Sequence, residues 1–291
     1  MKELLKEIRE SVNLSQVEIA DELGVSFATI NRWENGHAVP NRLAQERIYD
    51  FCIKHSVPLY SLVIRKIFSL SKEIDVSEGR IVLYHGSKSG IDGKIEPRSR
   101  DKCDFGKGFY MGTDPGQTLT LICDFPKSEF YIVSIDEKDL KIIEIPDNIE
   151  WAMLVAYYRG RMDKIKGTSL YNKYENYLSD NDLVIGSIAN DRMFYVIDNF
   201  FQGLITDEAL VGSLSALQLG KQYVMLTQKG CDHAKIERKV ELSWLERKCL
   251  QFVSEEKRIK GINIANDICK NYRREGRFFD EILDAAQKGE K

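Results

Sequence analysis

Residues 14–40 read LSQVEIADELGVSFATINRWENGHAVP, and this stretch decides the fold of the amino-terminal part of the chain. Apolar residues recur at helical spacing on both sides of Gly24, and Ser15 with the glutamate three residues later has the pattern of a capping box. Ser26 is placed to cap a second helix, and Gly36 stands where a left-handed residue ends a helix. The stretch therefore predicts two short helices joined by a tight GVS turn.

A helix, a glycine turn and a second helix form the arrangement that places its second helix in a DNA major groove. Residues 14–40 also resemble the bacterial Cro/C1-type repressor family. This resemblance implies that Gln16 contacts a backbone phosphate at the start of the first motif helix. It further implies that DNA is faced by Ser26, Phe27, Thr29, Asn31 and Arg32. Their chemistry is compatible, because Asn reads adenine edges and Arg reads guanine edges or phosphate.

The helical region has no net charge. Residues 1–67 contain nine Lys or Arg and nine Asp or Glu, so the electrostatic attraction that dominates DNA affinity is weak. The alternative is a helical module that has kept the scaffold but binds protein, or only dimerises. We favour DNA binding, as a homodimer on a paired half-site.

The composition of the whole chain is that of a folded protein. Its 291 residues exceed the usual size of one domain, so we expect two. Hydrophobic residues make up 43% of the chain, and a net charge of −3 argues against broad binding of polyanions. The sequence shows no apolar signal-peptide core and no uninterrupted apolar run of membrane-spanning length. We expect a cytoplasmic protein with no membrane partner.

The six cysteines are scattered along the chain. They form no C-x-x-C pair, and no histidine stands beside them at metal-ligand spacing. We therefore expect reduced thiols that serve packing, and no bound metal.

The predicted organisation is multidomain. Residues 1–68 form an all-α helix-turn-helix domain, with further helices over 41–55 and 58–71, and residues 69–79 form a polar linker. Residues 80–243 form an α+β domain, and residues 244–291 form a carboxy-terminal extension of two helices that divide near 260–263. In the α+β domain the strand patterns are IVLYHGS, EFYIVSID, KIIEI and QYVMLT, and the helical segments lie around 115–124, 148–164, 169–178 and 207–219.

Two stretches of the second domain carry chemistry. RIVLYHGS, residues 80–87, reads as a buried strand that ends in His85, Gly86 and Ser87, and FGKGFYMG follows at residues 105–112. Taken alone, a histidine at a strand end is more often structural, and a glycine-aromatic loop is more often a turn beside the core. The second stretch is neither a Rossmann fingerprint nor a P-loop.

Together, the two stretches resemble the ADP-ribosyltransferase family of the His-Tyr-Glu type, which includes the poly(ADP-ribose) polymerases and the diphtheria-toxin group. The resemblance implies an ADP-ribosyltransferase-like α+β fold with NAD as substrate. It implies that His85 bonds a ribose hydroxyl with help from Ser87, that the Gly86 backbone binds the nicotinamide amide, and that Tyr110 stacks on the nicotinamide ring. The catalytic set would be His85, Tyr110 and Gln222. The NAD-binding set would be His85, Gly86, Ser87, Arg100, Gly106, Gly108, Phe109 and Tyr110.

The glycine loop and the residues before it would hold the dinucleotide. The loop glycines would let the backbone pass close to NAD while a loop phenylalanine anchors it in the core. Three basic residues precede the loop, Arg98, Arg100 and Lys102. We assign the pyrophosphate to Arg100, because a guanidinium fork suits phosphate oxygens. The alternative is a solvated basic edge.

Two positions depart from the family pattern. Gln222 stands where the glutamate of a late strand is expected, and an amide can bond a ribose hydroxyl but cannot deprotonate an acceptor. This favours transfer of a single ADP-ribose over polymer formation. Gln218 is a weaker substitute. Leu121 stands where the family often places a second ring against nicotinamide.

Two further groups have competing interpretations. Asp191, which we expect in a loop, could orient a site residue or replace the missing base, or it could close an Asn-Asp turn on its own backbone. An aromatic and basic cluster at near-helical spacing could bind an acceptor, but a core with an exposed face is the favoured interpretation. Its members are Tyr157, Tyr158, Arg159 and Arg161.

These observations predict an NAD-dependent mono-ADP-ribosyltransferase with a DNA-binding module. Such an architecture resembles toxin and phage-defence effectors, which act on nucleic acid or protein and have an antitoxin partner. One alternative is a transcriptional regulator that senses NAD or ADP-ribose without turnover, which Gln222 favours. Another is an NAD glycohydrolase or an RNA 2′-phosphotransferase. The phosphotransferase normally needs more Arg and His around the phosphate than four histidines supply.

Overall fold

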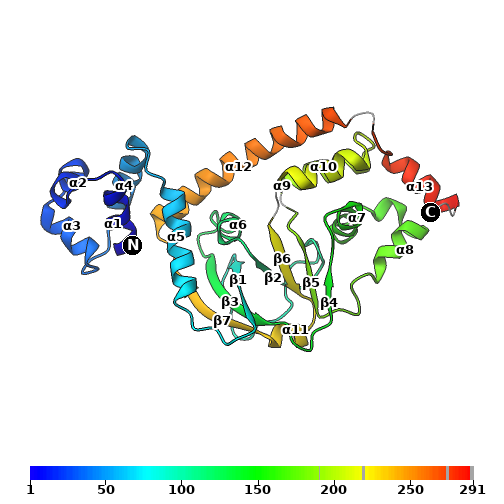
Figure 1. The fold of residues 1–291 in the computed structure, drawn as a ribbon, viewed down its shortest axis with the longest axis horizontal. Helices are drawn as coiled ribbons and strands as arrows, with labels where there is room; N and C mark the ends of the chain where they lie inside the picture. Colours follow the sequence, from blue (N-terminus) through cyan, green and yellow to red (C-terminus); the bar gives the residue numbers. More distant parts are fainter. Residues whose placement is uncertain (190, 218–219, 273–274, 289–291) are drawn as a thin grey trace.

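The computed structural model describes residues 1–189, 191–217, 220–272 and 275–288 (Figure 1). Its amino-terminal part is helical and contains α1 (Lys2–Ser11), α2 (Gln16–Leu23), α3 (Phe27–Glu34), α4 (Arg42–Lys54) and α5 (Leu59–Lys72). The Ser15 side chain accepts from the Glu18 amide and the Glu18 side chain accepts from the Ser15 amide, which completes the capping box. Gly24 ends α2 in the left-handed region, at φ 64°, and Ser26 caps α3. The predicted helix-turn-helix is confirmed.

The carboxy-terminal part contains a mixed sheet of seven strands in the order β4-β5-β6-β2-β1-β3-β7. Only β4 and β5 pair in parallel among the recorded strand pairs of the described residues. The strands are β1 (Arg80–Ser87), β2 (Phe109–Gly112), β3 (Glu129–Asp136), β4 (Ile142–Glu144), β5 (Leu183–Ser187), β6 (Lys221–Met225) and β7 (Ala234–Val240). The four predicted strand patterns are β1, β3, β4 and β6.

Short helices connect these strands. They are α6 (Pro115–Thr120), α7 (Ile149–Tyr158), the 3-10 turn η1 (Asp163–Ile165), α8 (Ser169–Glu175), α9 (Asp191–Phe201), α10 (Asp207–Leu217) and α11 (Gln228–Asp232). The predicted helical segments correspond to α6, α7 with η1, α8 and α10. Sequence analysis did not predict α9 or α11.

Different helices pack on the two halves of one face of the sheet, and a separate hydrophobic cluster lies on the other face. On one face Val184 and Val224 pack against Trp151 of α7 and Phe200 of α9, while β1 and β3 on the same face pack against α5 and α6. The opposite face buries a second cluster that includes Leu83, Phe109, Met111, Tyr131 and Met225. The site described below lies where β1 and β2 meet, between these two clusters.

The carboxy-terminal extension contains α12 (Trp244–Asn271) and α13 (Phe279–Lys288). The predicted division near 260–263 is wrong, because α12 continues through it as one helix of 28 residues. Gly261 lies there and is buried, and α12 packs against α9 and α10. This packing offsets the roughly 1 kcal/mol that a glycine costs inside a helix.

The helix-turn-helix module and the sheet share two helices. Leu245 and Cys249 of α12 complete the core of the module, whereas Leu250 packs on the sheet side. α5 divides in the same way, with Val63 in the core of the module and Ile67 against the sheet. Residues 69–72 of the predicted linker belong to α5. In Figure 1, α12 runs from the module across to α10.

Among the described residues, none of the helices combines the length and the apolar character needed to cross a membrane.

Candidate functional site

β1 and β2 meet at a single residue pair. All eight residues of β1 pair with β3, and all four residues of β2 pair with β6. Between β1 and β2, the described residues form one pair, Tyr84 with Gly112. The sheet therefore consists of two parts, β4-β5-β6-β2 and β1-β3-β7, that are joined by one residue pair. The YHGS end of β1 and the FYMG strand β2 lie on either side of that junction.

His85 bridges the junction with its side chain. Its Nδ1 lies 2.6 Å from the carbonyl oxygen of Tyr110, and its ring stacks on Phe109 with centroids 4.3 Å apart. A carbonyl oxygen only accepts hydrogen bonds, so Nδ1 carries the proton and Nε2 carries a lone pair. Nε2 has no hydrogen-bond partner among the described residues and is not fully buried. His85 therefore offers a ligand one hydrogen-bond acceptor.

The imidazole of His85 is neutral at pH 7. Burial lowers the pKa of His85 from 6.5 to about 4, and the hydrogen bond to the Tyr110 carbonyl only partly opposes this shift. Desolvation disfavours the charged form of a histidine, which explains the direction. The acceptor at Nε2 thus persists over the whole neutral range.

We expect the folded chain to lose stability as the pH falls from about 6.5 to about 4. In this window unfolded His85 binds a proton and folded His85 does not, so acid favours the unfolded chain. The His85→Asn variant keeps a donor near the Nδ1 position but does not titrate. The free energy of unfolding, measured with urea at several pH values, should fall for the native chain by up to about 3 kcal/mol more than for the variant. Parallel pH profiles would contradict a depressed pKa.

The other two motif side chains lie on the opposite face of the sheet. Gln222 pairs with Gly112, which pairs in turn with Tyr84. Tyr110 lies two residues from Gly112, and Gly86 lies two residues from Tyr84. Because side chains alternate along a strand, Gln222, Tyr110 and Gly86 share a face. His85 shares the other face with Phe109. The structure therefore brings His85 to the backbone of Tyr110, and a ligand that contacts both His85 and Gln222 must reach past the junction.

The Tyr110 side chain closes the glycine loop. Its hydroxyl donates to the Gly106 carbonyl at 2.7 Å and accepts from the Phe105 amide at 3.0 Å. Burial raises the pKa of Tyr110, and the ring is partly buried beside Val224 and its neighbours. The ring and the loop conformation are thus fixed together.

Gln222 belongs to a buried polar network. The residue is 5% exposed, and its Nε2 donates to Asp104 Oδ2 at 2.8 Å and to the Ser187 carbonyl at 2.9 Å. Asp104 also accepts from Arg159 Nε at 3.0 Å and from the Ala189 amide at 2.9 Å. Sequence analysis gave Asp104 no role, because no local spacing relates it to a strand 118 residues away.

The loop glycines are required by packing within the chain itself. Gly106 has φ 75°, and a Cβ there would lie 2.7 Å from the Tyr158 ring. A Cβ on Gly108 would overlap Val224, and one on Gly86 would lie 2.8 Å from a methyl group of Ile122. Sequence analysis expected NAD to come close to the backbone at these three glycines. The structure places neighbouring side chains of the chain itself there.

Comparison with protein families identifies both parts of the chain. Residues 5–43 match the family described as Helix-turn-helix. Residues 81–235, more than half of the chain, match the family described as Protein of unknown function (DUF3990). The chain belongs to this family. No curated protein and no solved structure matches the chain.

The remaining positions considered for the site of the DUF3990 domain lie at the end of β1, in the segment before the glycine loop and at the end of α6. Ser87 donates its hydroxyl to the Gly90 carbonyl at 2.7 Å, and Arg98 pairs with Glu96. Arg100 and Lys102 are exposed. Leu121 is 53% exposed at the end of α6. These positions are at least partly exposed, and the assignment of Ser87 and Arg100 to NAD remains a prediction.

Asp191 is the first residue of α9 in the DUF3990 domain, so the predicted loop there is wrong. The helix forms because apolar residues at helical spacing, Met193, Val196, Ile197 and Phe200, are all buried. The Asp191 side chain and Gln218 lie outside the described residues. No group of His, Cys, Asp or Glu in the described part of the chain could hold a metal ion.

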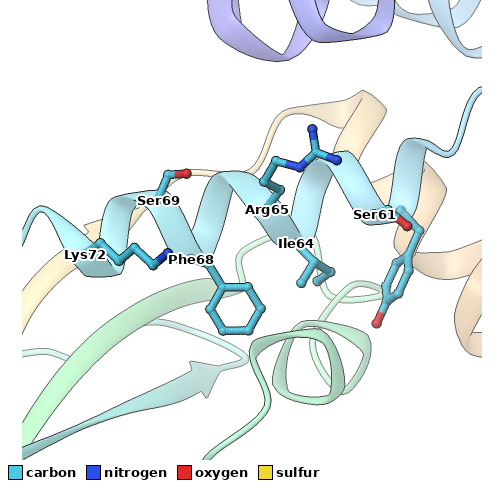
Figure 2. Close-up of a pocket in the computed structure, with 7 residues that line it drawn as sticks. Ser61, Ile64, Arg65, Phe68, Ser69 and Lys72 are labelled. Atoms are coloured by element: carbon cyan, nitrogen blue, oxygen red, sulfur yellow. The ribbon is translucent and has the colours of Figure 1, made fainter. Parts of the chain in front are cut away.

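A pocket of about 550 Å³ lies along α5, beside the DUF3990 domain (Figure 2). Ile64 and Phe68 extend from α5 toward α6 and the sheet, and the Phe68 ring meets Tyr84 of β1 edge-on at 6.4 Å. The lining residues are Tyr60, Ser61, Ile64, Arg65, Phe68, Ser69 and Lys72. None of them was predicted as a site residue, and we do not assign the candidate site to this pocket.

The helix-turn-helix module exposes three of the six predicted DNA contacts. Ser26 and Arg32 are exposed, and Phe27 is 50% exposed. Thr29 is partly buried, and its hydroxyl lies 2.9 Å from that of Ser26. The start of α3 therefore presents a polar and aromatic surface.

Gln16 and Asn31 connect the two motif helices. Asn31 Nδ2 donates to Gln16 Oε1 at 3.3 Å, and Gln16 Nε2 donates to Glu34 Oε2 at 2.7 Å. Glu34 is held in turn by Arg9, with Nε and Oε1 2.8 Å apart. The network fixes the first turn of α2 against α3.

Proposed function

We propose that the DUF3990 domain is an NAD-dependent mono-ADP-ribosyltransferase and that the helix-turn-helix module binds DNA. The observation that carries the enzymatic proposal is the 2.6 Å contact between His85 Nδ1 and the Tyr110 carbonyl. It joins two sequence stretches, YHGS and FGKGFYMG, that resemble the ADP-ribosyltransferases only in combination. Their meeting point is also where the two parts of the sheet are joined by a single residue pair.

The chemistry of NAD cleavage suits the groups present. The bond between the ribose C1′ and the nicotinamide nitrogen breaks, nicotinamide leaves with the bonding electrons, and C1′ acquires oxocarbenium character. A bond from C1′ to the acceptor then forms, and the acceptor releases a proton. His85 Nε2 and Gln222 Oε1 would accept hydrogen bonds from ribose hydroxyls and orient the sugar. Because the two side chains lie on opposite faces of the sheet, the ribose would have to sit at the junction of β1 and β2 and be reached from both sides. The Tyr110 ring would face the nicotinamide.

The uncharged Gln222 limits what the site can do. An amide cannot take a proton from an acceptor, so we propose single transfers to an acceptor that another group activates or that is itself a good nucleophile. The same property supports a second candidate function, in which the domain binds NAD or ADP-ribose without turnover and regulates DNA binding.

NAD labelled separately in its nicotinamide and adenine parts tests these proposals. The full chain would be incubated with this NAD and, in parallel, with duplex DNA, RNA, protein or buffer alone. Released nicotinamide with adenine label on a macromolecule supports transfer. Released nicotinamide with soluble ADP-ribose indicates hydrolysis, and saturable binding without release indicates the sensor. The absence of both binding and release contradicts an NAD site.

DNA binding is tested by salt-dependent titration of the full chain. We expect the Arg32→Ala variant to bind duplex DNA about tenfold more weakly, and the slope of log affinity against log salt to become shallower by about 1. Lys270→Ala removes an exposed cation at the end of α12 and serves as the matched control. A salt-independent titration, or equal losses in the two variants, would contradict recognition through α3.

A further inference from the structure

We propose that Asp104 is a positioning residue that holds the amide of Gln222 in one orientation, so that Gln222 Oε1 faces the ribose. This inference rests on the proposed NAD-dependent function. In this arrangement the neutral acceptor Gln222 Oε1 stands in place of the expected charged residue of the late strand. Asp104, at the start of the glycine loop, sets its direction.

The neighbours of the Gln222 amide determine its orientation. The Asp104 carboxylate and the Ser187 carbonyl are both acceptors, and they lie 2.8 Å and 2.9 Å from the same amide atom. Only the NH₂ group can face two acceptors, so this atom is Nε2. Oε1 consequently points away from them. It has no donor among the described residues and is not fully buried.

Asp104 is itself firmly held. One carboxylate oxygen accepts from the Arg159 guanidinium, and the other accepts from the Ala189 amide as well as from Gln222. Asp104 is 3% exposed, and Arg159 also donates to the Ala189 carbonyl at 3.3 Å. An ionised acceptor surrounded by three donors forms stronger hydrogen bonds than a neutral one. The amide of Gln222 is thus tied to a fixed point.

The Gln222 side chain fits between its neighbours on the sheet but has little room to rotate. Its register partners on the two neighbouring strands are Gly112 and Gly186, which have no side chains. The space above Gly186 is filled by the Phe105 ring, and the space above Gly112 is filled by Thr118. Phe105 follows Asp104 in the chain, so one loop both packs beside Gln222 and bonds it.

This arrangement explains the departure from the family pattern. A glutamate at position 222 would place a second carboxylate next to Asp104 and the Ser187 carbonyl, with no proton to share. Repulsion between the two carboxylates would raise the pKa of the introduced group. The residue that these neighbours accept is an amide, and Asp104 supplies the carboxylate of the site.

The first test requires no NAD. We expect the Gln222→Glu variant to melt at a lower temperature than the native chain, and the difference to grow as the pH rises from 5 to 8. The sign follows because the introduced carboxyl has a higher pKa folded than unfolded, so ionisation favours the unfolded chain. Adding Asp104→Asn should reduce this pH dependence, since an asparagine amide can donate to the new carboxylate. A pH-independent difference would overturn the contact.

The second test measures turnover. We expect Asp104→Asn to lower kcat for NAD cleavage at least tenfold with less than a threefold change in KM. The groups that contact NAD remain in this variant, but Gln222 Oε1 is no longer held toward the ribose. Asp182→Asn is the matched control. Asp182 is also buried and bonds a lysine, a hydroxyl and a backbone amide, but it lies at the far end of β5. It should lower the melting temperature and leave kcat unchanged.

The outcomes separate the two proposals. A native chain that neither binds nor cleaves NAD ends the proposed function, and the positioning role ends with it. A native chain that cleaves NAD while Asp104→Asn keeps its full kcat overturns the positioning role alone. Loss of kcat in Asp104→Asn, with none of the loss in Asp182→Asn, supports both.

Discussion

The Tyr110→Ala variant is expected to lose at least about 100-fold in kcat/KM for NAD cleavage. Two contributions combine. The ring that would face nicotinamide is removed, which costs on the order of 1 kcal/mol of stacking. The hydroxyl that bonds the Phe105 amide and the Gly106 carbonyl is removed as well. Without these bonds the loop that carries Asp104 loses its shape, and misplacement of a catalytic group by about 1 Å costs about 100-fold.

Tyr110→Phe separates the ring from the hydroxyl. This variant keeps the stacking surface and leaves two backbone groups without their partner, which should lower the free energy of unfolding by about 1–3 kcal/mol. We expect its kcat/KM to lie between those of the native chain and Tyr110→Ala. Rates would be measured with labelled NAD, and folding by circular dichroism. Native activity in a folded Tyr110→Ala variant would remove Tyr110 from the site.

The helix-turn-helix could be predicted because its signals are local. Ser15, Gly24 and Ser26 each act on a backbone group within three residues, through a cap or a left-handed turn. Side chains and the backbone groups that they satisfy are therefore adjacent in the sequence. The division of α12 failed for the opposite reason. Its continuity depends on packing against distant helices.

Three strands had no readable pattern. β2 is short, and as FYMG it ends in the glycine that pairs with Tyr84. β5 is buried at every position, so it lacks the alternation that marks a strand with one wet face. β7, AKIERKV, is charged because it forms the edge of the sheet. Four of the seven strands could therefore be predicted from the sequence, but the strand order that creates the junction could not.

The candidate site was only partly predictable. Sequence selected His85 and Tyr110, and the structure places the His85 side chain on the Tyr110 carbonyl. Selection of Gln222 as the doubtful residue was also informative, because its amide turns out to have a specific acceptor. The acceptor, Asp104, could not be chosen in advance. It is one acidic residue among 45, and only the fold brings it to Gln222.

Replacing Lys66 with methionine should destabilise the chain by about 3–5 kcal/mol, because it leaves the Glu246 carboxylate buried without its cation. Lys66 Nζ of α5 lies 2.7 Å from Glu246 Oε1 in the first turn of α12, and Glu246 is 1% exposed. Burial raises the pKa of Glu246, but Lys66 and the Ser243 hydrogen bonds outweigh it, so the net pKa is lowered. In the variant burial is no longer balanced by a cation.

The pH dependence identifies this mechanism. With Lys66 removed, the pKa of Glu246 should rise, so the loss of unfolding free energy should be larger at pH 7.5 than at pH 4.5, where the carboxyl takes up a proton. Urea unfolding at both pH values measures the difference. Lys270→Met breaks an exposed pair on the same helix and should cost less than about 0.5 kcal/mol. Adding Glu246→Leu to Lys66→Met removes both charges and should recover most of the loss, whereas a double variant no more stable than Lys66→Met would show that the buried pair is not what joins the two modules.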